Sequence, residues 1–211
     1  MTEKIIKRIG IMFVISSPSG AGKTTLARRL LKDDKDIELS ISCTTRKRRA
    51  EEINKKDYIF VNEKVFDKMV KEEKFLEHAL VFGNKYGTPK EAVIKKLILG
   101  KDILFDIDWQ GTQALREKEP KNVVSVFILP PSKNILEERL ITRAQDSKNE
   151  VKKRMAKANS EITHWPEYDY LIINDNLEET SKKLKAILIA ERLKRSRQTG
   201  LNDFVREILL L

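Results

Sequence analysis

Cysteine is nearly absent from this chain of 211 residues, and long apolar runs are absent altogether. The single cysteine, Cys43, cannot form an internal disulfide, and no apolar run is long enough for a membrane span or a secretory signal. Internal repeats and low-complexity linkers are also missing. These absences argue against a secreted, membrane-bound or repetitive protein, and they favour a location in the cytoplasm.

The chain does contain enough apolar sequence for one core, together with a large surplus of positive charge. Hydrophobic residues make up 40% and charged residues 35% of the chain, a balance typical of folded soluble domains. A length of 211 residues fits one compact domain with insertions. The net charge of +10 comes from 42 basic against 32 acidic residues. It attracts polyanions, which leaves nucleic acids and nucleotides both open as ligands.

Apolar runs that alternate with helical patterns predict an α/β protein. The chain begins with an apolar strand over 11–15, a turn over 16–22 and a helix from 23 to about 32. Because helical patterns separate most of the further β-like runs, these runs predict a mostly parallel sheet. They lie at 37–43, 57–61, 75–83, 102–108, 123–129 and 168–174.

Two stretches break this alternation. In residues 42–100 the expected strands lie close together around a helix at 63–73, and a further helix begins at Pro89, which indicates a small inserted unit. Residues 139–159 are polar nearly all round and carry many charges. Since such a segment has little apolar face to bury, we expect it to pack loosely and to move.

The turn SSPSGAGKTT (16–25) has the residue types of a phosphate-binding loop. Gly20 and Gly22 allow a tight turn with inward-pointing amides, and Lys23 adds a positive charge at a helix N-terminus. Ser17 stands where the pattern G-x-x-x-x-G-K-[ST] has its first glycine, so it must accept that glycine's backbone geometry. The alternative is a glycine-rich turn with a solvated lysine. We predict nucleotide-phosphate contacts from Ser17, Pro18, Ser19, Gly20, Ala21, Gly22, Lys23, Thr24 and Thr25, with the Thr24 hydroxyl on a magnesium ion.

Further motifs follow in order along nearly the whole chain, and with them the chain resembles the guanylate kinase family. They are SCTTRKRRAEEINKKDYIFV (42–61), FLEHALVFGNKYGTPK (75–90), DILFDIDWQG (102–111) and IIND (172–175). The resemblance implies Mg²⁺-dependent transfer of the γ-phosphoryl group of ATP to GMP, giving ADP and GDP. It also implies a three-layer phosphate-loop nucleoside monophosphate kinase fold. The expected division is a core at 1–41, 101–138 and 160–211, a GMP-binding insert at 42–100 and a lid at 139–159.

The resemblance implies that the insert holds the phosphate of GMP. Arg46 and Arg49 resemble the family's phosphate clamp, because guanidinium groups hold phosphate oxygens in pairs. Tyr58 and Tyr86 resemble the phenols that donate hydroxyls to the same phosphate. On its own, the run RKRR is more typical of a solvated basic surface.

The resemblance also implies a guanine-reading residue, Glu77. Guanine presents two adjacent donors, N1–H and the N2 amino group, to one carboxylate, whereas adenine presents an acceptor there. Ser42, Thr88 and Asp108 resemble the other residues around the base. Alternation in FLEHALVF leaves a solvent-facing strand position equally open for Glu77.

Two aspartates, Asp106 and Asp108, follow in the motif DILFDIDWQG. Asp106 and Asp108 are two apart in an expected strand, so their side chains share a face. By resemblance, Asp106 lies beside the magnesium ion and the phosphate loop. The alternative is a structural ion pair with nearby lysines.

The polar stretch 139–159 carries three arginines, Arg139, Arg143 and Arg154, that resemble lid arginines closing over ATP and neutralising charge on the phosphoryl group. Solvated helix charges are the alternative. By resemblance, Asn174 contributes to the adenine side. The expected catalytic residues are therefore Lys23, Arg46, Arg139, Arg143 and Arg154.

Departures from the family pattern cluster at the entrance of the GMP site. Arg48 replaces a proline, Glu51 and Lys55 replace glycines, and Ala144 replaces a lid glycine. Two other classes stay open: a guanylate-kinase-like module that binds phosphorylated peptides without catalysis, and a basic nucleic-acid-binding protein. We expect GMP and ATP as partners, without nucleic acid or membrane, and a homo-oligomer is possible.

Overall fold

The structure, a computed structural model, describes residues 6–81, 83–144 and 148–209. Its centre is a five-stranded, wholly parallel sheet in the order β2-β7-β1-β8-β9. The strands are β1 Met12–Ser16, β2 Ile37–Leu39, β7 Asp102–Asp106, β8 Val123–Leu129 and β9 Tyr170–Ile173. All five residues of β1 are buried, because a central parallel strand is covered on both faces. This explains why its sequence is a continuous apolar run.

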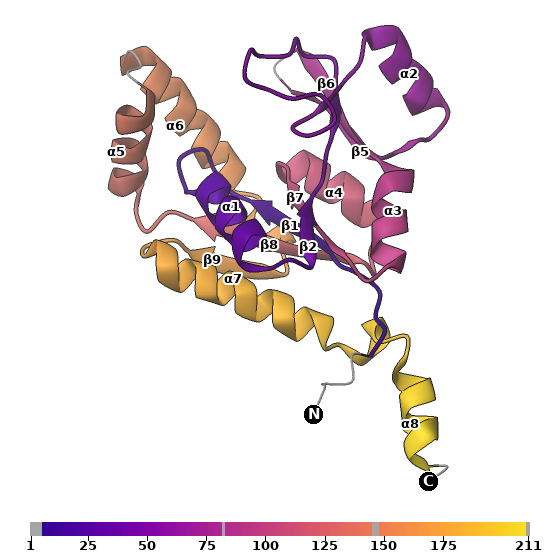
Figure 1. The fold of residues 1–211 in the computed structure, drawn as a ribbon. Coiled ribbons are helices and arrows are strands. Elements are labelled where there is room, and N and C mark those ends of the chain that lie inside the picture. The colour runs from indigo at the N-terminus through magenta and orange to yellow at the C-terminus, as the bar shows by residue number, and fades with distance from the viewer. Residues whose placement is uncertain (1–5, 82, 145–147, 210–211) are drawn as a thin grey trace.

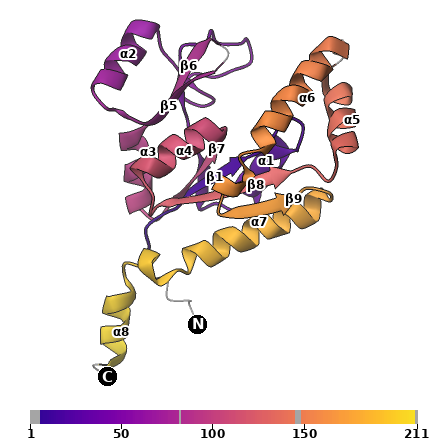
Figure 2. The ribbon, with the colours of Figure 1, turned by 180° about the vertical axis from the view of Figure 1, so that it is seen from behind.

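Helices cover both faces of this sheet, which makes three layers (Figures 1 and 2). On one face, Phe13 and Ile15 of β1 pack with residues of α1 Lys23–Asp33 and α7 Leu177–Arg192. On the other face, Met12 and Val14 pack with residues of α3 Lys90–Ile98 and α4 Trp109–Lys118. Alternate residues of one strand thus serve two separate cores. The predicted α/β architecture with a mostly parallel sheet is confirmed.

A second, mixed sheet in the order β4-β3-β6-β5 stands beside the core (Figure 1). Its strands are β3 Cys43–Thr44, β4 Ile59–Phe60, β5 Phe75–Val81 and β6 Asn84–Pro89, and it carries helix α2 Glu63–Lys71. Cys43 packs with Phe66 and Phe75 in its small core, and burial raises the pKa of the Cys43 thiol to about 11. The expected single strand over 37–43 is wrong, since β2 belongs to the central sheet and β3 to the small one.

Two helices, α5 Lys133–Ala144 and α6 Lys148–Ile162, form a pair that rises from the same side of the sheet as the insert (Figure 1). Their contact is a separate apolar cluster of Leu136, Leu140, Val151, Met155 and Ala158. The expectation of loose packing for 139–159 is therefore wrong. The few apolar residues recur at helical spacing, so they meet on one line even though most of the surface is charged.

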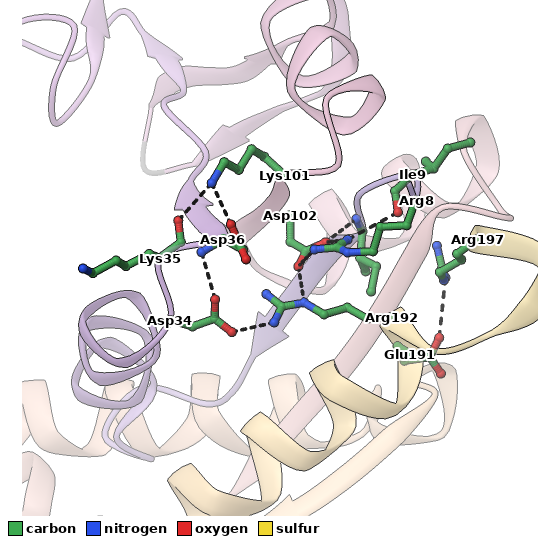
Figure 3. A network of polar contacts seen from close by, with 11 residues as sticks. Arg8, Ile9, Asp34, Lys35, Asp36, Lys101, Asp102, Glu191, Arg192 and Arg197 are labelled. Carbon is green, nitrogen blue, oxygen red and sulfur yellow. Dashed lines mark hydrogen bonds and ion pairs between the residues drawn. The ribbon is translucent and has the colours of Figure 1, made fainter. Parts of the chain in front are cut away.

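The amino end of the sheet, opposite the phosphate loop, is held by buried charges (Figure 3). Asp102, at the start of β7, is fully buried and accepts hydrogen bonds from Arg8 at 2.6 and 3.0 Å and from Arg192 Nε at 2.6 Å. Arg192 also pairs with Asp34 at 2.7 Å. Because a buried charge without partners is costly, this network fixes the N-terminal segment, α1 and α7 to one strand end.

Short elements complete the fold: η1 Trp165–Glu167 precedes β9, and η2 Arg195–Arg197 and α8 Leu201–Leu209 follow α7. Helix α8 projects from the base of the molecule (Figures 1 and 2). Within the described ranges, none of the helices combines the length and apolar character needed to cross a membrane.

Candidate active site

A cleft of about 550 Å³ lies at the carboxyl ends of β1 and β7. In open parallel α/β sheets, ligands bind at this edge. The loop between β1 and α1 forms much of the wall, together with Lys23, Thr24, Asp106, Asp108 and Arg139. The two remaining charged residues of the wall, Arg28 and Glu161, were not predicted from the sequence.

The phosphate loop needs glycine at two positions. Gly20 and Gly22 have φ angles of 90° and 96°, in the region that side chains rarely adopt. A Cβ at Gly22 would also lie 2.5 Å from Nδ2 of Asn174. Ser17, in contrast, does not have a positive φ. The serine at the first position of the motif therefore causes no backbone strain, and its hydroxyl donates to the carbonyl of Pro18 at 3.0 Å.

Asn174 lies beneath this loop rather than in the cleft wall. Its side chain, 4% exposed, donates from Nδ2 to the carbonyl of Ala21 at 2.7 Å. Its backbone carbonyl accepts from Arg139 at 3.4 Å. Asn174 thus supports the loop from below, and its predicted role in ATP binding stays a prediction.

Lys23 forms an ion pair with Asp106 across the cleft. Asp106 is the last residue of β7, so the expected strand over 102–108 ends two residues early. Asp108 is instead the N-cap of α4, and its carboxylate accepts the N–H of Gly111 at 3.0 Å. The argument that Asp106 and Asp108 share a strand face is therefore wrong, although both line the same cleft.

Glu77 is buried in the insert, 4% exposed, so the solvent-facing alternative is wrong. The Thr88 hydroxyl donates to Glu77 Oε1 at 2.7 Å, and the Ser42 hydroxyl lies 3.5 Å from that of Thr88. Burial raises the pKa of the Glu77 carboxyl to about 7, and the nearby charge of Asp108 adds to the increase. The structure thus brings together Ser42, Glu77 and Thr88, with Asp108 close enough to act on them electrostatically.

An aromatic and cationic cluster lies in the same insert. The guanidinium carbon of Arg46 is 5.3 Å from the ring centroid of Tyr58, whose ring meets that of Tyr86 edge-on at 6.1 Å. Burial raises the pKa of Tyr58, which keeps its hydroxyl a donor at neutral pH. Arg46 also pairs with Glu52 at 2.6 Å, and the backbone N–H of Arg49 donates to the same carboxylate at 2.8 Å. Glu52 was not predicted, because its acidic charge follows a basic run and carries no separate signal.

The three expected lid arginines have different positions. Arg139 lines the cleft, and its Nη1 is buried without a hydrogen-bond partner among the described residues. Arg154 is half-buried in α6 and is not among the residues that line the cleft. Arg143 belongs to α5, but its side chain lies outside the described part of the structure, as do those of residues 144 and 148–150.

These features define a class. A Gly-rich loop between a buried parallel strand and a helix, with a lysine at the helix start, binds nucleotide phosphates. An insert with an arginine, two phenols and a buried carboxylate carries groups that can bind a phosphorylated ligand. The protein is therefore of the phosphate-loop nucleotide-binding class.

Comparisons with known proteins identify the family. The sequence profile described as guanylate kinase matches residues 10–191. A guanylate kinase of Nitrobacter winogradskyi is 56% identical over 96% of this chain and 93% of its own length. A guanylate kinase of Paramagnetospirillum magneticum is 54% identical over 99% of this chain and 98% of its own length. The crystal structure of guanylate kinase from Anaplasma phagocytophilum has a TM-score of 0.76 and 37% identity, and the match covers 95% of this chain and 96% of that one. The chain belongs to the guanylate kinase family, as its sequence predicted.

Proposed function

We propose that this chain transfers the γ-phosphoryl group of ATP to GMP in a Mg²⁺-dependent reaction that gives ADP and GDP. The observation that carries the proposal is the link between the cleft and Glu77. Asp108 lines the cleft of the phosphate loop and accepts the N–H of Gly111 at 3.0 Å, and a Cβ on Gly111 would lie 3.5 Å from Oε2 of Glu77. A nucleotide on the loop and a base at Glu77 would therefore meet at one place.

On the ATP side, the loop amides and Lys23 would bind the phosphates. The Thr24 hydroxyl and the Asp106 carboxylate are the oxygen ligands that Mg²⁺ prefers, and both line the cleft. No three carboxylate, histidine or cysteine side chains converge as a metal cluster in the described ranges, which fits an ion held mainly through substrate phosphates and water. Once bound, the ion would neutralise charge on the phosphates. Arg139, Arg143 and Arg154 would add positive charge from α5 and α6.

On the GMP side, the ionised carboxylate of Glu77 would accept both donors of the guanine edge. Thr88 already holds one of its oxygens at 2.7 Å, which fixes the carboxylate in place, and Ser42 lies next to Thr88. Arg46, Arg49, Tyr58 and Tyr86 would hold the phosphate. Because the free carboxyl has a pKa of about 7, GMP would bind best above that pH.

Catalysis would consist of positioning and charge neutralisation, without a covalent enzyme intermediate. An oxygen of the GMP phosphate would attack the γ-phosphorus in line with the leaving oxygen of ADP. Lys23 would exchange its partner Asp106 for phosphate oxygens as ATP enters. Exclusion of water matters, since water would otherwise compete as the nucleophile.

A coupled assay of ADP release with GMP, AMP, UMP and dTMP tests the proposal. We expect GMP to be the preferred acceptor by far, with little ADP released when no acceptor is present. ADP release that does not depend on GMP would contradict it. A cytoplasmic location, the absence of nucleic-acid ligands and the oligomeric state stay predictions.

A further inference from the structure

Helix α6 and the phosphate loop are joined by one carboxylate, that of Glu161. Its Oε2 accepts the backbone N–H of Ser19 at 3.2 Å. Glu161 lies near the end of α6 in the helical pair, whereas Ser19 belongs to the core. The side chain of Glu161 is 15% exposed and forms part of the cleft wall. Lys157, one turn earlier, approaches the other carboxylate oxygen at 3.6 Å.

The position of this carboxylate conflicts with the chemistry of the loop. Backbone N–H groups of a phosphate loop are donors for phosphate oxygens. In the structure, one of these donors, on Ser19, already serves an anion, so the Glu161 carboxylate stands where a phosphate oxygen would be. A bound ATP phosphate would meet a negative charge at the same N–H, and the two anions cannot share it without repulsion.

We infer that Glu161 is a positioning residue that holds α6 on the phosphate loop until ATP displaces it. In the nucleotide-free chain the carboxylate occupies the Ser19 N–H and anchors the helical pair. ATP takes that donor, the carboxylate leaves, and α6 becomes free to move over the nucleotide. The inference rests on the proposed ATP site and adds that ATP, not GMP, releases α6.

Tryptophan fluorescence can report on a movement of α6. It contains two tryptophans, Trp109 and Trp165. Trp165 lies three residues after the end of α6. Trp109 stacks on His164 with ring centroids 3.6 Å apart and an angle of 9° between the planes. Displacement of α6 should alter both environments, so intrinsic fluorescence reports on the step that the inference describes.

The test compares Glu161→Gln with the wild-type chain. Glutamine keeps the size and an acceptor oxygen but removes the charge that opposes ATP. We expect the variant to bind ATP about 2- to 10-fold more tightly and to bind GMP as before, as measured by calorimetry. Glu137→Gln, an exposed carboxylate of α5, is the matched control and should leave both affinities unchanged. Glu161→Ala should behave like Glu161→Gln.

A second measurement needs no variant. Titration of the wild-type chain with ATP should change tryptophan fluorescence, whereas GMP alone should change it far less. Equal or weaker ATP binding by a folded Glu161 variant, or fluorescence that ATP leaves unchanged, overturns the inference. A wild-type chain that binds no ATP at all would instead contradict the proposed function, so the two failures can be told apart.

Discussion

The proposed ATP site and the proposed GMP site of this molecule are built in different ways. The phosphate loop uses backbone amides and a helix start, and its geometry depends on two glycines with positive φ and on the support of Asn174 from below. The GMP side uses side chains from a small mixed sheet, where a buried carboxylate, hydroxyls, phenols and an arginine come from separate strands and loops. The comparison teaches that the loop is part of the central sheet's own architecture, whereas the proposed base site consists of side chains of a separate, smaller sheet.

Replacing Lys23 with methionine separates the two sides most sharply. The lysine lies at the start of α1 and pairs with Asp106 in the ATP cleft. We expect phosphoryl transfer to fall by a factor on the order of 10³ or more, because the variant loses the positive charge at the start of α1, where the loop would hold the phosphates. GMP affinity, measured by calorimetry, should stay close to that of the wild type. Near-normal turnover in this variant would show that the loop does not carry the ATP phosphates.

Replacing Glu77 with glutamine should affect the proposed GMP site. The substitution keeps the shape but places an amide donor opposite the donors of guanine. We expect a loss of roughly 2–4 kcal/mol, about 30- to 800-fold in kcat/KM for GMP, and a smaller preference for GMP over AMP. Steady-state kinetics with both nucleotides measure these changes, and ATP affinity serves as the internal control. Unchanged kcat/KM and unchanged selectivity would mean that Glu77 does not contact the base.

The pH dependence of GMP binding should show a smaller effect. The pKa of Glu77 in the free chain is raised to about 7 by burial, and the guanine donors need the ionised form. Below pH 7 the affinity for GMP should therefore fall, by up to about tenfold per pH unit, and above pH 8 it should level off. Calorimetry from pH 6 to 8.5 measures this.

The GMP phosphate titrates in a similar range, so the control is the same series with Glu77→Gln. The difference between the two pH profiles belongs to Glu77. Two profiles of the same shape would rule out a carboxyl with a raised pKa in the base pocket.

Ser17→Gly should have the smallest effect. Ser17 departs from the motif, but its backbone is unstrained and its hydroxyl donates to the carbonyl of Pro18. We expect ATP affinity to change by less than about threefold, since the lost contact is one part-buried hydrogen bond between neighbouring residues, of small net value. A large decrease in ATP affinity would mean that the Ser17 hydroxyl contacts the nucleotide directly.

The same comparison explains what the sequence could predict. The phosphate loop is local, so ten consecutive residues between a strand and a helix sufficed to predict it. The GMP pocket joins residues 42, 77 and 88 with Asp108, and for Glu77 the alternation of its strand left a solvent-facing position equally open. Resemblance to a family was needed there. The structure resolves the ambiguity, because Glu77 is buried against Thr88.

The sequence patterns could not predict the positions of three acidic residues, Asp102, Asp108 and Glu161. The sequence places Asp102 at the start of an apolar strand. Its buried ion pairs with Arg8 and Arg192 form only because the fold brings together residues that are far apart in the sequence. Asp108 fits a strand alternation as well as a helix cap, and only the hydrogen bond from Gly111 decides between them. Glu161 lies in a helix rich in charged residues, so nothing in the sequence distinguishes it from the other charged positions.

Phosphorus NMR of the chain with ATP, Mg²⁺ and GMP tests the central claim most directly, because it follows the fate of the phosphoryl group itself. If the two pockets form one reaction site, ADP and GDP should appear together in equal amounts, with no free phosphate. With Glu77→Gln the same products should appear more slowly. Release of inorganic phosphate with ADP, and no GDP, would contradict the account, since the phosphoryl group would then have gone to water rather than to GMP.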